Sequence, residues 1–483
     1  MTATDNPRKA VIVTTTPHDS ALSRRGLLRA GAAGGMGIAL AGNLDIFAGP
    51  AAALGAPKPP TGYGPLIADP AGVLALPAGF SYTLVAKTGG TTLDTGELCP
   101  DDPDGIGCFP GKQKGSVLVT NHEVGGSEPN GVPTAAGLTY DTGARGGTTT
   151  IEVDRTGNRV KHYVSLAGTH NNCAGGITPW DTWLTCEETE QRKGGRFLRD
   201  HGYVFEVDPY DQAANRDPVP LKFLGRYAHE AVVVNPHSSE IYLTEDAGNP
   251  HGLYYRWVPP RHFRGRKGAL RALALAPGGD TAGQLQAMRC TLDGVHVPDL
   301  AAATAPGTKY KVTWINVADR DAQTTSVRKQ FAAGVVTNSN KLEGAWWGDG
   351  GAYFVASFAR TADGSPQQHD GQVWFYDPRR ATVELKTLFG VNQTPDVDGA
   401  NFDGPDNITV SPYGGLILAE DGAGVSHLVG VTEQGKTYAL ARNDLNDSEF
   451  CGPTFSADGR ILFANIQAPG HILAITGPWH RRR

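Results

Sequence analysis

The chain has 483 residues and a formal net charge of −6 at neutral pH, and it contains 63 glycines and 33 prolines. The acidic balance argues against general binding to nucleic acid. The glycine and proline content predicts short strands joined by many turns, and roughly 425 residues beyond the N-terminal segment suffice for one large β domain or two ordinary ones.

The N-terminal segment, residues 1–56, has the features of an export signal followed by a linker. Paired arginines in Ser23–Arg29 (SRRGLLR) precede an Ala/Gly-rich stretch, and Ala51–Ala53 offers small residues for cleavage. Asn43 and Asp45 make the stretch too polar for a strong membrane span. Paired arginines are typical of the address that the twin-arginine translocation machinery reads. We therefore expect a periplasmic or extracellular protein, without stable membrane insertion, whose mature domain occupies residues 57–483.

The mature chain is more acidic than the whole chain. Residues 1–53 hold five basic and three acidic side chains, so their removal leaves a formal net charge near −8. A negative net charge of this size suits a protein that binds multivalent cations. Six cysteines in an exported protein permit disulfides, and Cys99 and Cys108 flank a loop-like segment in which they could pair.

Short β-rich stretches recur along the mature chain, and Asp-Pro or Asn-Pro turns separate many of them. This repetition with a period of tens of residues predicts an all-β fold, a β-propeller. Residues 259–328 interrupt the rhythm, so we interpret them as an insertion between blades, with a short helix near Asp319–Phe331. The predicted strands are Gly115–Glu123, Thr148–Val153, Thr182–Glu187, Tyr203–Val207, Ala231–Asn235, Ile241–Thr244, Leu253–Val258, Lys311–Asn316, Ala345–Trp347, Ala352–Ser357, Gln372–Tyr376, Val383–Phe389, Ile408–Val410, Leu416–Ala419, Leu428–Thr432, Thr454–Ser456 and Ile461–Asn465.

Two of the predicted hairpins share a pattern of acidic residues. Glu230–Asp246 (EAVVVNPHSSEIYLTED) and Asp406–Asp421 (DNITVSPYGGLILAED) each start on a carboxylate and end on Glu-Asp. The pattern extends along the chain in weaker form. Its starts are Cys173, Glu230, Glu343, Asp406 and Cys451, and its ends are Asn121–Glu123, Cys186–Glu188, Thr244–Asp246, Ala356–Phe358, Ala419–Asp421 and Asn465–Gln467.

The geometry of an antiparallel hairpin places these residues together. The first residue of one strand and the last residue of the next lie on the same face of a propeller, so many carboxylates would meet at one mouth of the channel. Crowded like charges are tolerable when they are protonated, paired with bases or bound to cations. Few basic residues occur in these motifs, so we expect cations.

The candidate ligands indicate the kind of metal. Carboxylate and amide oxygens suit calcium, and a trivalent, oxygen-loving transition metal is also compatible. The thiol of Cys173, in the register of Glu230 and Asp406, adds a softer ligand that favours a transition metal. His122 and His229 flank acidic residues and are candidates for metal binding or proton transfer, although a lone histidine is more often a packing residue. Trp180, Trp183, Trp346 and Trp347 are interpreted as packing residues.

Seven short strings, taken in order and behind this signal, resemble the secreted alkaline phosphatase family PhoX, whose members depend on calcium and iron and carry a twin-arginine signal. The resemblance spans residues 66–475. The strings are Val119–Glu123, Asn172–Trp180, Leu184–Glu188, His229–Glu230, Glu343–Trp347, Pro405–Asn407 and Glu420–Gly422.

The resemblance implies a six-bladed propeller that hydrolyses small-molecule phosphate monoesters at a cluster of Fe³⁺ and Ca²⁺ ions, in a monomeric protein. It implies a catalytic role for Glu343 and for Lys341, which stands where the family usually has arginine. Asp181 similarly stands where glycine is expected. The implied metal ligands are Cys173, Glu188, Glu230, Glu245, Glu343, Asp406 and Glu420, followed by Asn121, Glu123, Glu187, Asp246 and Asp421.

Two other functions remain open from the sequence. A calcium-dependent lactonase or organophosphate hydrolase would also be a propeller with acidic and amide ligands, and Asn121, Asn172 and Asn407 would fit one. The chain offers more candidate ligands than a single calcium site uses. The second alternative is a non-catalytic propeller in which calcium stiffens a binding surface.

Overall fold

The computed structural model describes residues 61–396 and 401–480. The predicted export signal, residues 1–56, lies outside the described residues. Within the described part, strands predominate and the single α-helix is α1 (Ala269–Leu275). None of its helices is long and apolar enough to cross a membrane. Short 3₁₀ helices occur at Lys112–Lys114, Gln212–Asn215, Lys222–Leu224, Gly279–Thr281, Leu300–Ala302, Val327–Gln330 and Thr361–Asp363.

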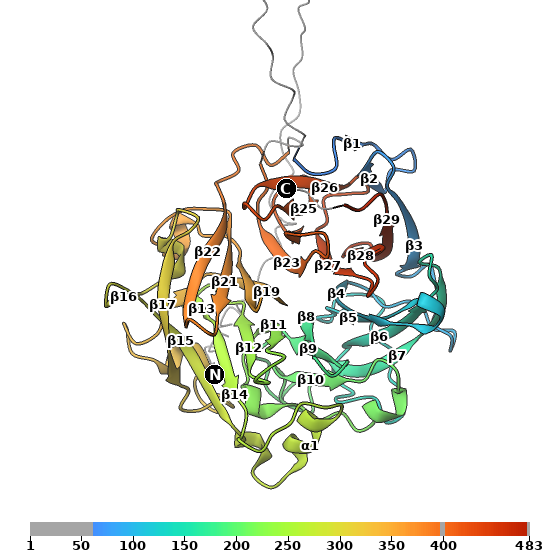
Figure 1. Cartoon of the computed structure of the whole chain (residues 1–483). Coiled ribbons are helices and arrows are strands. Elements are labelled where there is room, and N and C mark those ends of the chain that lie inside the picture. The colour runs from blue at the N-terminus through green and yellow to red at the C-terminus, as the bar shows by residue number, and fades with distance from the viewer. Residues whose placement is uncertain (1–60, 397–400, 481–483) are drawn as a thin grey trace, which may run out of the picture. The chain divides into compact units, whose positions relative to one another are not determined.

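The strands are arranged around a common centre, as in a propeller (Figure 1). The strands nearest the centre, called the inner strands below, contact one another in sequence order, and the last contacts the first, so they form a closed ring. The inner strands are β4 (Pro103–Pro110), β8 (Asn172–Ile177), β11 (His229–Val234), β19 (Leu342–Gly348), β23 (Pro405–Val410) and β27 (Phe450–Phe455).

Each inner strand begins an antiparallel series that runs outward. β4 is followed by β5 (Ser116–His122), β6 (Gly146–Val153) and β7 (Arg159–Thr169), and β8 by β9 (Trp183–Glu187) and β10 (Val204–Val207). β23 is followed by β24 (Leu416–Glu420), β25 (His427–Val431), β26 (Thr437–Asn443), β2 (Leu74–Pro77) and β1 (Leu66–Ile67).

The two ends of the described chain meet in one sheet. β27 is followed by β28 (Ile461–Ile466), β29 (His471–Thr476) and then β3 (Ser81–Lys87), which comes from the N-terminal side of the domain. In Figure 1, blue β3 lies beside red β29. A strand from one end of the chain thus completes the sheet formed by the other end, and this pairing holds the ring closed.

The largest sheet joins two neighbouring series through their outer strands. Its order is β11, β12 (Ile241–Glu245), β14 (Tyr255–Val258), β15 (Gln284–Leu292), β17 (Lys309–Asn316), β22 (Thr382–Phe389), β21 (Gly371–Asp377), β20 (Gly351–Ala356) and β19. β16 (Val295–Val297) pairs with β15, and β13 (Gly252–Leu253) pairs with β18 (Asn338–Ser339).

Residues 259–328, predicted as an insertion, therefore contribute to the sheet. They contain α1 and also β15 and β17, which pair with each other. β15 extends the sheet of β14, and β17 pairs with β22. The helix predicted near Asp319–Phe331 is a 3₁₀ helix over Val327–Gln330.

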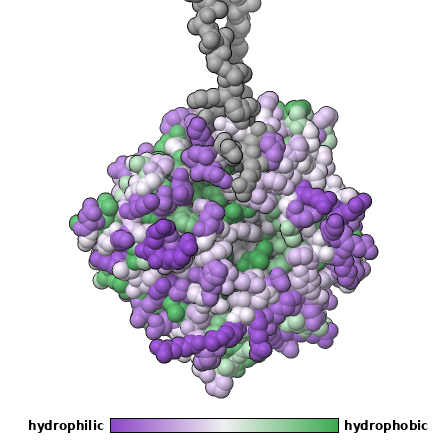
Figure 2. Space-filling model, in the orientation of Figure 1, coloured by the Kyte–Doolittle hydropathy of each residue, from purple (hydrophilic) through white to green (hydrophobic). Residues whose placement is uncertain are grey.

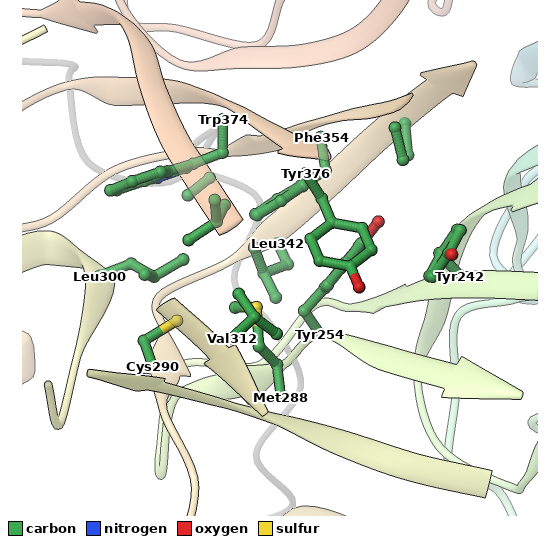
Figure 3. Close-up of a cluster of buried hydrophobic side chains, with 14 of the residues drawn as sticks. Tyr242, Tyr254, Met288, Cys290, Leu300, Val312, Leu342, Phe354, Trp374 and Tyr376 are labelled. Atoms are coloured by element: carbon green, nitrogen blue, oxygen red, sulfur yellow. The ribbon is translucent and has the colours of Figure 1, made fainter. Parts of the chain in front are cut away.

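Aromatic side chains fill the space between β11–β17 and β19–β22 (Figure 3). The rings of Tyr254 and Phe354 stack with centroids 4.2 Å apart, and Tyr242 meets Tyr376 edge to face at 5.2 Å. Trp183, one of the four tryptophans predicted to pack, is buried in a separate cluster. The contacts between the two series of the largest sheet fix the angle between them and thereby the positions of their inner strands, β11 and β19.

The cysteines do not follow the predicted pairing. All six are buried and free, so Cys99 and Cys108 are not joined by a disulfide, although both lie in the same apolar cluster. On the face of the molecule in Figure 2, hydrophilic residues dominate the outer parts.

Candidate metal centre

The six inner strands share an irregularity near their first residues. In each, the register with the next strand shifts two or three residues into the pairing, for example between His229 and Val232 in β11 and between Pro405 and Ile408 in β23. Such a bulge redirects a side chain out of the regular alternation. The residues that directly follow the first paired residue of each inner strand are Asp104, Cys173, Glu230, Glu343, Asp406 and Cys451.

The second strand of each series runs back toward the same end. The residue directly after that strand lies beside the bulge, because the two strands are antiparallel. These residues are Glu123, Glu188, Asp246, Ser357, Asp421 and Gln467. The carboxylate repeat predicted from the sequence thus corresponds to two rings of side chains at one end of the central channel.

The two rings bring acidic and thiol groups together in four overlapping sets. Within each set, the candidate ligand atoms all lie within 4.8 Å of one another. Cys173, Glu230 and Asp406 each belong to two sets, so the sets form one connected cluster. The sets are Asp104–Glu123–Cys173, Cys173–Glu188–Glu230, Glu230–Glu343–Asp406 and Asp406–Asp421–Glu449.

Small residues beside the cluster let the inner strands approach closely. A Cβ atom on Gly105 would lie 2.8 Å from the Cα of Ala174, and one on Gly344 would lie 2.6 Å from the Cα of Asn407. Neither spacing leaves room for a side chain. Residues that follow the bulges line one small central cavity, and they come from all of the inner strands: Gly105, Ala174, Ala231, Gly344, Asn407 and Gly452.

The cluster contains carboxylate oxygens that no hydrogen-bond donor of the described residues reaches. Both carboxylate oxygens of Glu230 are buried and, among the described residues, have no hydrogen-bond partner. Burial, and then the charges of Asp406 and Glu343, raise the pKa of Glu230 well above its ordinary value. Burial raises the pKa of Asp104 to about 7. Buried carboxylates without donors fit cations, which would supply the missing positive charge.

Lys341 is the basic residue in contact with the cluster. Its Nζ lies 2.8 Å from Oδ2 of Asp246 and 3.0 Å from Oε1 of Glu343. Burial alone would lower the pKa of Lys341, but Asp246 and Glu343 raise it well above its ordinary value. One ammonium group offsets one of the negative charges, and bound cations would balance the others.

Glu187, Glu245 and Glu420, predicted as ligands, lie outside the four sets. Each is the last residue of its strand, so the alternation of the strand turns its side chain away from that of the next residue. The next residues are Glu188 and Asp421, which belong to the sets, and Asp246, which lies outside them and pairs with Lys341. Protein donors occupy the oxygens of Glu187, Glu245 and Glu420 instead. Glu187 accepts from the backbone N–H groups of Gly202 and Tyr203, Glu245 from Leu253 N–H, Tyr255 Oη and Arg328 Nη1, and Glu420 from the N–H groups of Asp403 and His427.

Asn121 also has a structural environment. Its Nδ2 donates to the carbonyl oxygens of Cys173 and Ala174, and its Oδ1 accepts from Trp183 and Thr185. The amide oxygen is therefore engaged inside the protein. We assign Asn121 the task of joining β5 to β8, which holds Cys173 in place.

The side chains of the two candidate histidines are buried and form hydrogen bonds within the protein. His122 bonds to the carbonyl of Asp101 and the hydroxyl of Thr149. His229 bonds to the carbonyl of Gly225 and stacks on Tyr227 at 3.7 Å. Burial lowers the pKa of His122 to about 4 and that of His229 to about 3. Both are packing residues that stay neutral at physiological pH.

Asp104 and Glu449 belong to the cluster but were missing from the predicted ligands. Asp104 had a recognisable signal, because Asp104-Gly105 stands at the start of β4 as Glu343-Gly344 stands at the start of β19. Asp104 is absent from the predicted ligands because the segment between Cys99 and Cys108 is interpreted from the sequence as a loop and not as the start of a strand. Glu449 lies in the connection before β27, outside the repeat, and no sequence pattern distinguishes it.

Replacing Arg328 with methionine should destabilise the folded protein by about 3 kcal/mol at pH 8, because it leaves the buried carboxylate of Glu245 without its counter-charge. Arg328 Nη1 lies 3.0 Å from both Glu245 and Glu190, and burial raises the pKa of Glu245 to about 7. Denaturant unfolding measures the change. Arg380→Met removes an exposed guanidinium that pairs with Asp377, and it should cost less than about 1 kcal/mol because backbone N–H groups also donate to Asp377. Equal losses in the two variants would contradict this role.

With this geometry established, comparison with known proteins identifies the family. The model of the alkaline phosphatase PhoX family matches residues 61–163 and 156–470, so the chain belongs to that family. The resemblance in the sequence is thereby confirmed. Among curated proteins no match was found.

Solved structures that match this chain are distant from it in sequence. A gluconolactonase from Xanthomonas campestris is 12% identical, with a TM-score of 0.40, and the match covers 87% of this chain and 99% of that one. The PQQ domain of a pyranose dehydrogenase from Coprinopsis cinerea is 11% identical, with a TM-score of 0.37, and the match covers 83% of this chain and 97% of that one.

Proposed function

We propose that this protein hydrolyses phosphate monoesters with metal ions held by the channel cluster, in a propeller whose inner strands define six blades. One observation carries the proposal: acidic side chains from separate strands converge at one channel mouth, and Glu230 has no hydrogen-bond partner among the described residues. Membership in the PhoX family supports the phosphatase activity. Oxygen ligands suit Ca²⁺, and the thiol of Cys173 among them favours a transition metal, for which the family resemblance implies Fe³⁺.

The residues that would hold the metal ions follow from the four overlapping sets. They are Asp104, Glu123, Cys173, Glu188, Glu230, Glu343, Asp406, Asp421 and Glu449, with Asp246 at the edge beside Lys341. Bound cations would neutralise the oxygens of the ester and lower the pKa of a bound water. The carboxylates of the cluster would fix where those charges sit.

Lys341 would act on the phosphate directly. Its ammonium group lies at the cluster and keeps its proton, so it offers a positive charge to the charge that develops in the transition state. Glu343 holds this ammonium group in place at 3.0 Å and belongs to a metal set as well. These two residues are the proposed catalytic pair.

The proposal extends to export. A twin-arginine signal in residues 1–56 would deliver the domain, folded and loaded with metal, to the periplasm or the medium, where phosphate esters are available. We propose that the domain acts there as a monomer without stable membrane insertion.

Release of p-nitrophenol from p-nitrophenyl phosphate tests the function. The purified protein should hydrolyse this ester, lose activity when a chelator removes its metals, and regain activity with calcium but not with magnesium. A lactonase would instead open a lactone such as gluconolactone and leave the ester intact. Metal-loaded protein that hydrolyses neither compound would support the non-catalytic alternative.

Lys341→Gln should lower kcat/KM for this ester by about tenfold or more, because it removes the positive charge beside the cluster. Lys341→Arg should keep most of the activity, since the guanidinium retains the charge and can bind phosphate with two donors. Lys309→Gln, which removes an exposed lysine paired with Glu384, is the matched control. Full activity in Lys341→Gln would exclude the proposed role.

A further inference from the structure

Basic residues are distributed unevenly around the channel mouth. The connection between β9 and β10 begins at Glu188 of the cluster and carries the exposed side chains of Lys193, Arg196 and Arg199. Three other connections at this end of the ring contain acidic residues but neither lysine nor arginine. They are residues 88–102, 421–426 and 444–449.

The basic connection is a folded loop and not a loose segment. Its two ends are joined by a hydrogen bond from the backbone N–H of His201 to the carbonyl of Gln191, at 2.9 Å, and Gly194 and Phe197 form a bridge within it. The side chain of Phe197 is buried and packs against the ring of His201. The loop therefore presents its charged side chains in fixed places.

Two guanidinium groups of this loop are held in place from one side. That of Arg196 lies over the ring of Phe197, 4.8 Å from its centroid, and donates to the carbonyl of Gly125. That of Arg199 lies over the ring of Tyr140 at 4.9 Å. A Cβ atom on the neighbouring Gly126 would collide with the Arg196 guanidinium, so the glycine at this position leaves room for it.

A short series of contacts joins Arg196 to the metal centre. Gly125, which accepts from Arg196, lies two residues after Glu123 of the cluster. The side chain of Asn171 is adjacent to Gly125 and donates to Oε1 of Glu123 at 3.4 Å. The guanidinium is thus one layer of residues away from the cluster, at its rim.

Three positive charges of this loop are available to a ligand. The acidic residues of the loop are paired with other arginines: Asp200 with Arg192 at 3.1 Å, and Glu190 with Arg328 at 3.0 Å. Among the described residues, no ion pair involves Lys193, Arg196 or Arg199. Arginine is suited to phosphate because its planar fork donates two hydrogen bonds at once.

We propose that Lys193, Arg196 and Arg199 form a rim subsite for a second phosphate group of the substrate. The inference rests on the proposed phosphatase function and deepens it. The ester bond lies at the metal cluster while a second, uncleaved phosphate lies against the basic loop. The preferred substrates are accordingly phosphate esters that carry a further phosphate, rather than esters with a neutral remainder.

The ratio of kcat/KM for fructose 1,6-bisphosphate to that for fructose 6-phosphate, from phosphate release, tests this subsite. The wild-type protein should prefer the bisphosphate, and added salt should reduce the preference. Arg196→Gln should lower the ratio by about tenfold, because it removes a bidentate phosphate donor. Arg199→Gln, a second variant of the same loop, should lower it in the same direction.

Arg379→Gln is the matched control, since it also removes an exposed arginine, from the β21–β22 turn at the opposite end of the strands from the mouth. It should keep the wild-type ratio, and thermal melting verifies that all variants are folded. Hydrolysis of both sugars with a ratio unchanged in both loop variants would overturn the subsite alone. Wild-type protein that hydrolyses neither sugar nor p-nitrophenyl phosphate would overturn the phosphatase function and the subsite with it.

Discussion

Glu230→Gln is expected to lower kcat/KM for p-nitrophenyl phosphate by at least about a hundredfold. Glu230 belongs to two of the four sets of candidate ligands, so its charge is shared between two neighbouring positions for a cation. Glu230 is 1% exposed, and neither of its carboxylate oxygens has a hydrogen-bond partner among the described residues. Glutamine keeps the size of the side chain and removes the charge that would hold the metal.

The matched control is Glu240→Gln. Glu240 precedes β12 at the end remote from the channel mouth, where it accepts from Tyr242 and pairs with Arg256 at 3.4 Å. The same change of charge there should leave activity near the wild-type level. Near-normal activity in Glu230→Gln would contradict the proposed metal centre. A loss of equal size in Glu240→Gln would show that the effect is not specific to the cluster.

The second large effect concerns the protein from which the metals have been removed. The stability of this metal-free protein should fall as pH rises. Burial raises the pKa of Glu230, Glu343 and Asp406, so their protonated forms are favoured in the folded protein. Their contribution to stability is complete below the unfolded values, 4.5 for glutamate and 3.8 for aspartate, and is lost as pH rises through the raised values.

Asp104 gives the scale of this effect. Its pKa is raised from 3.8 to about 7, and a shift of that size is linked to a loss on the order of 4 kcal/mol between pH 4 and pH 8. Calorimetric melting of chelator-treated protein should therefore show a melting temperature that falls by more than about 5 °C over that range. Excess calcium should raise the melting temperature most at the alkaline end, because it binds the ionised cluster.

The opposite result would be informative. A melting temperature that stays constant or rises with pH in the metal-free protein would mean that the carboxylates are compensated by the protein itself. Glu230→Gln provides an internal comparison. By removing one of the crowded charges, it should make the metal-free protein more stable than the wild type at pH 8, even though it weakens metal binding.

The hairpin repeat in the sequence predicted where the acidic residues would gather. The structure brings Glu230, Glu343 and Asp406 into one set, because the same bulge occurs at the start of each inner strand. The sequence predicts both acids of each Glu-Asp or Glu-Glu pair as ligands, with precedence for Glu245 and Glu420, whereas the structure places the second acid of each pair toward the channel. Both members are acids at the end of a strand, and only the strand direction and the donors around Glu245 and Glu420 separate them.

Other differences have equally local causes. β15 lies in a part of the predicted insertion where no strand is expected, because the turn and helix between β14 and β15 break the spacing of the repeat. β17 matches the strand predicted over Lys311–Asn316. Asp181 and Lys341, which depart from the family pattern, both adopt left-handed backbone conformations, with φ of 61° and 44°. Glycine adopts such a conformation readily, which accounts for the glycine expected at position 181.

Elemental analysis of the protein purified without chelator, for wild type and Glu230→Gln side by side, tests the central claim most directly. We expect the wild type to contain several metal ions per chain, with both calcium and iron present, and the variant to contain fewer under the same conditions. Wild-type protein that carries no bound metal yet hydrolyses p-nitrophenyl phosphate, or a variant with unchanged metal content, would contradict the account.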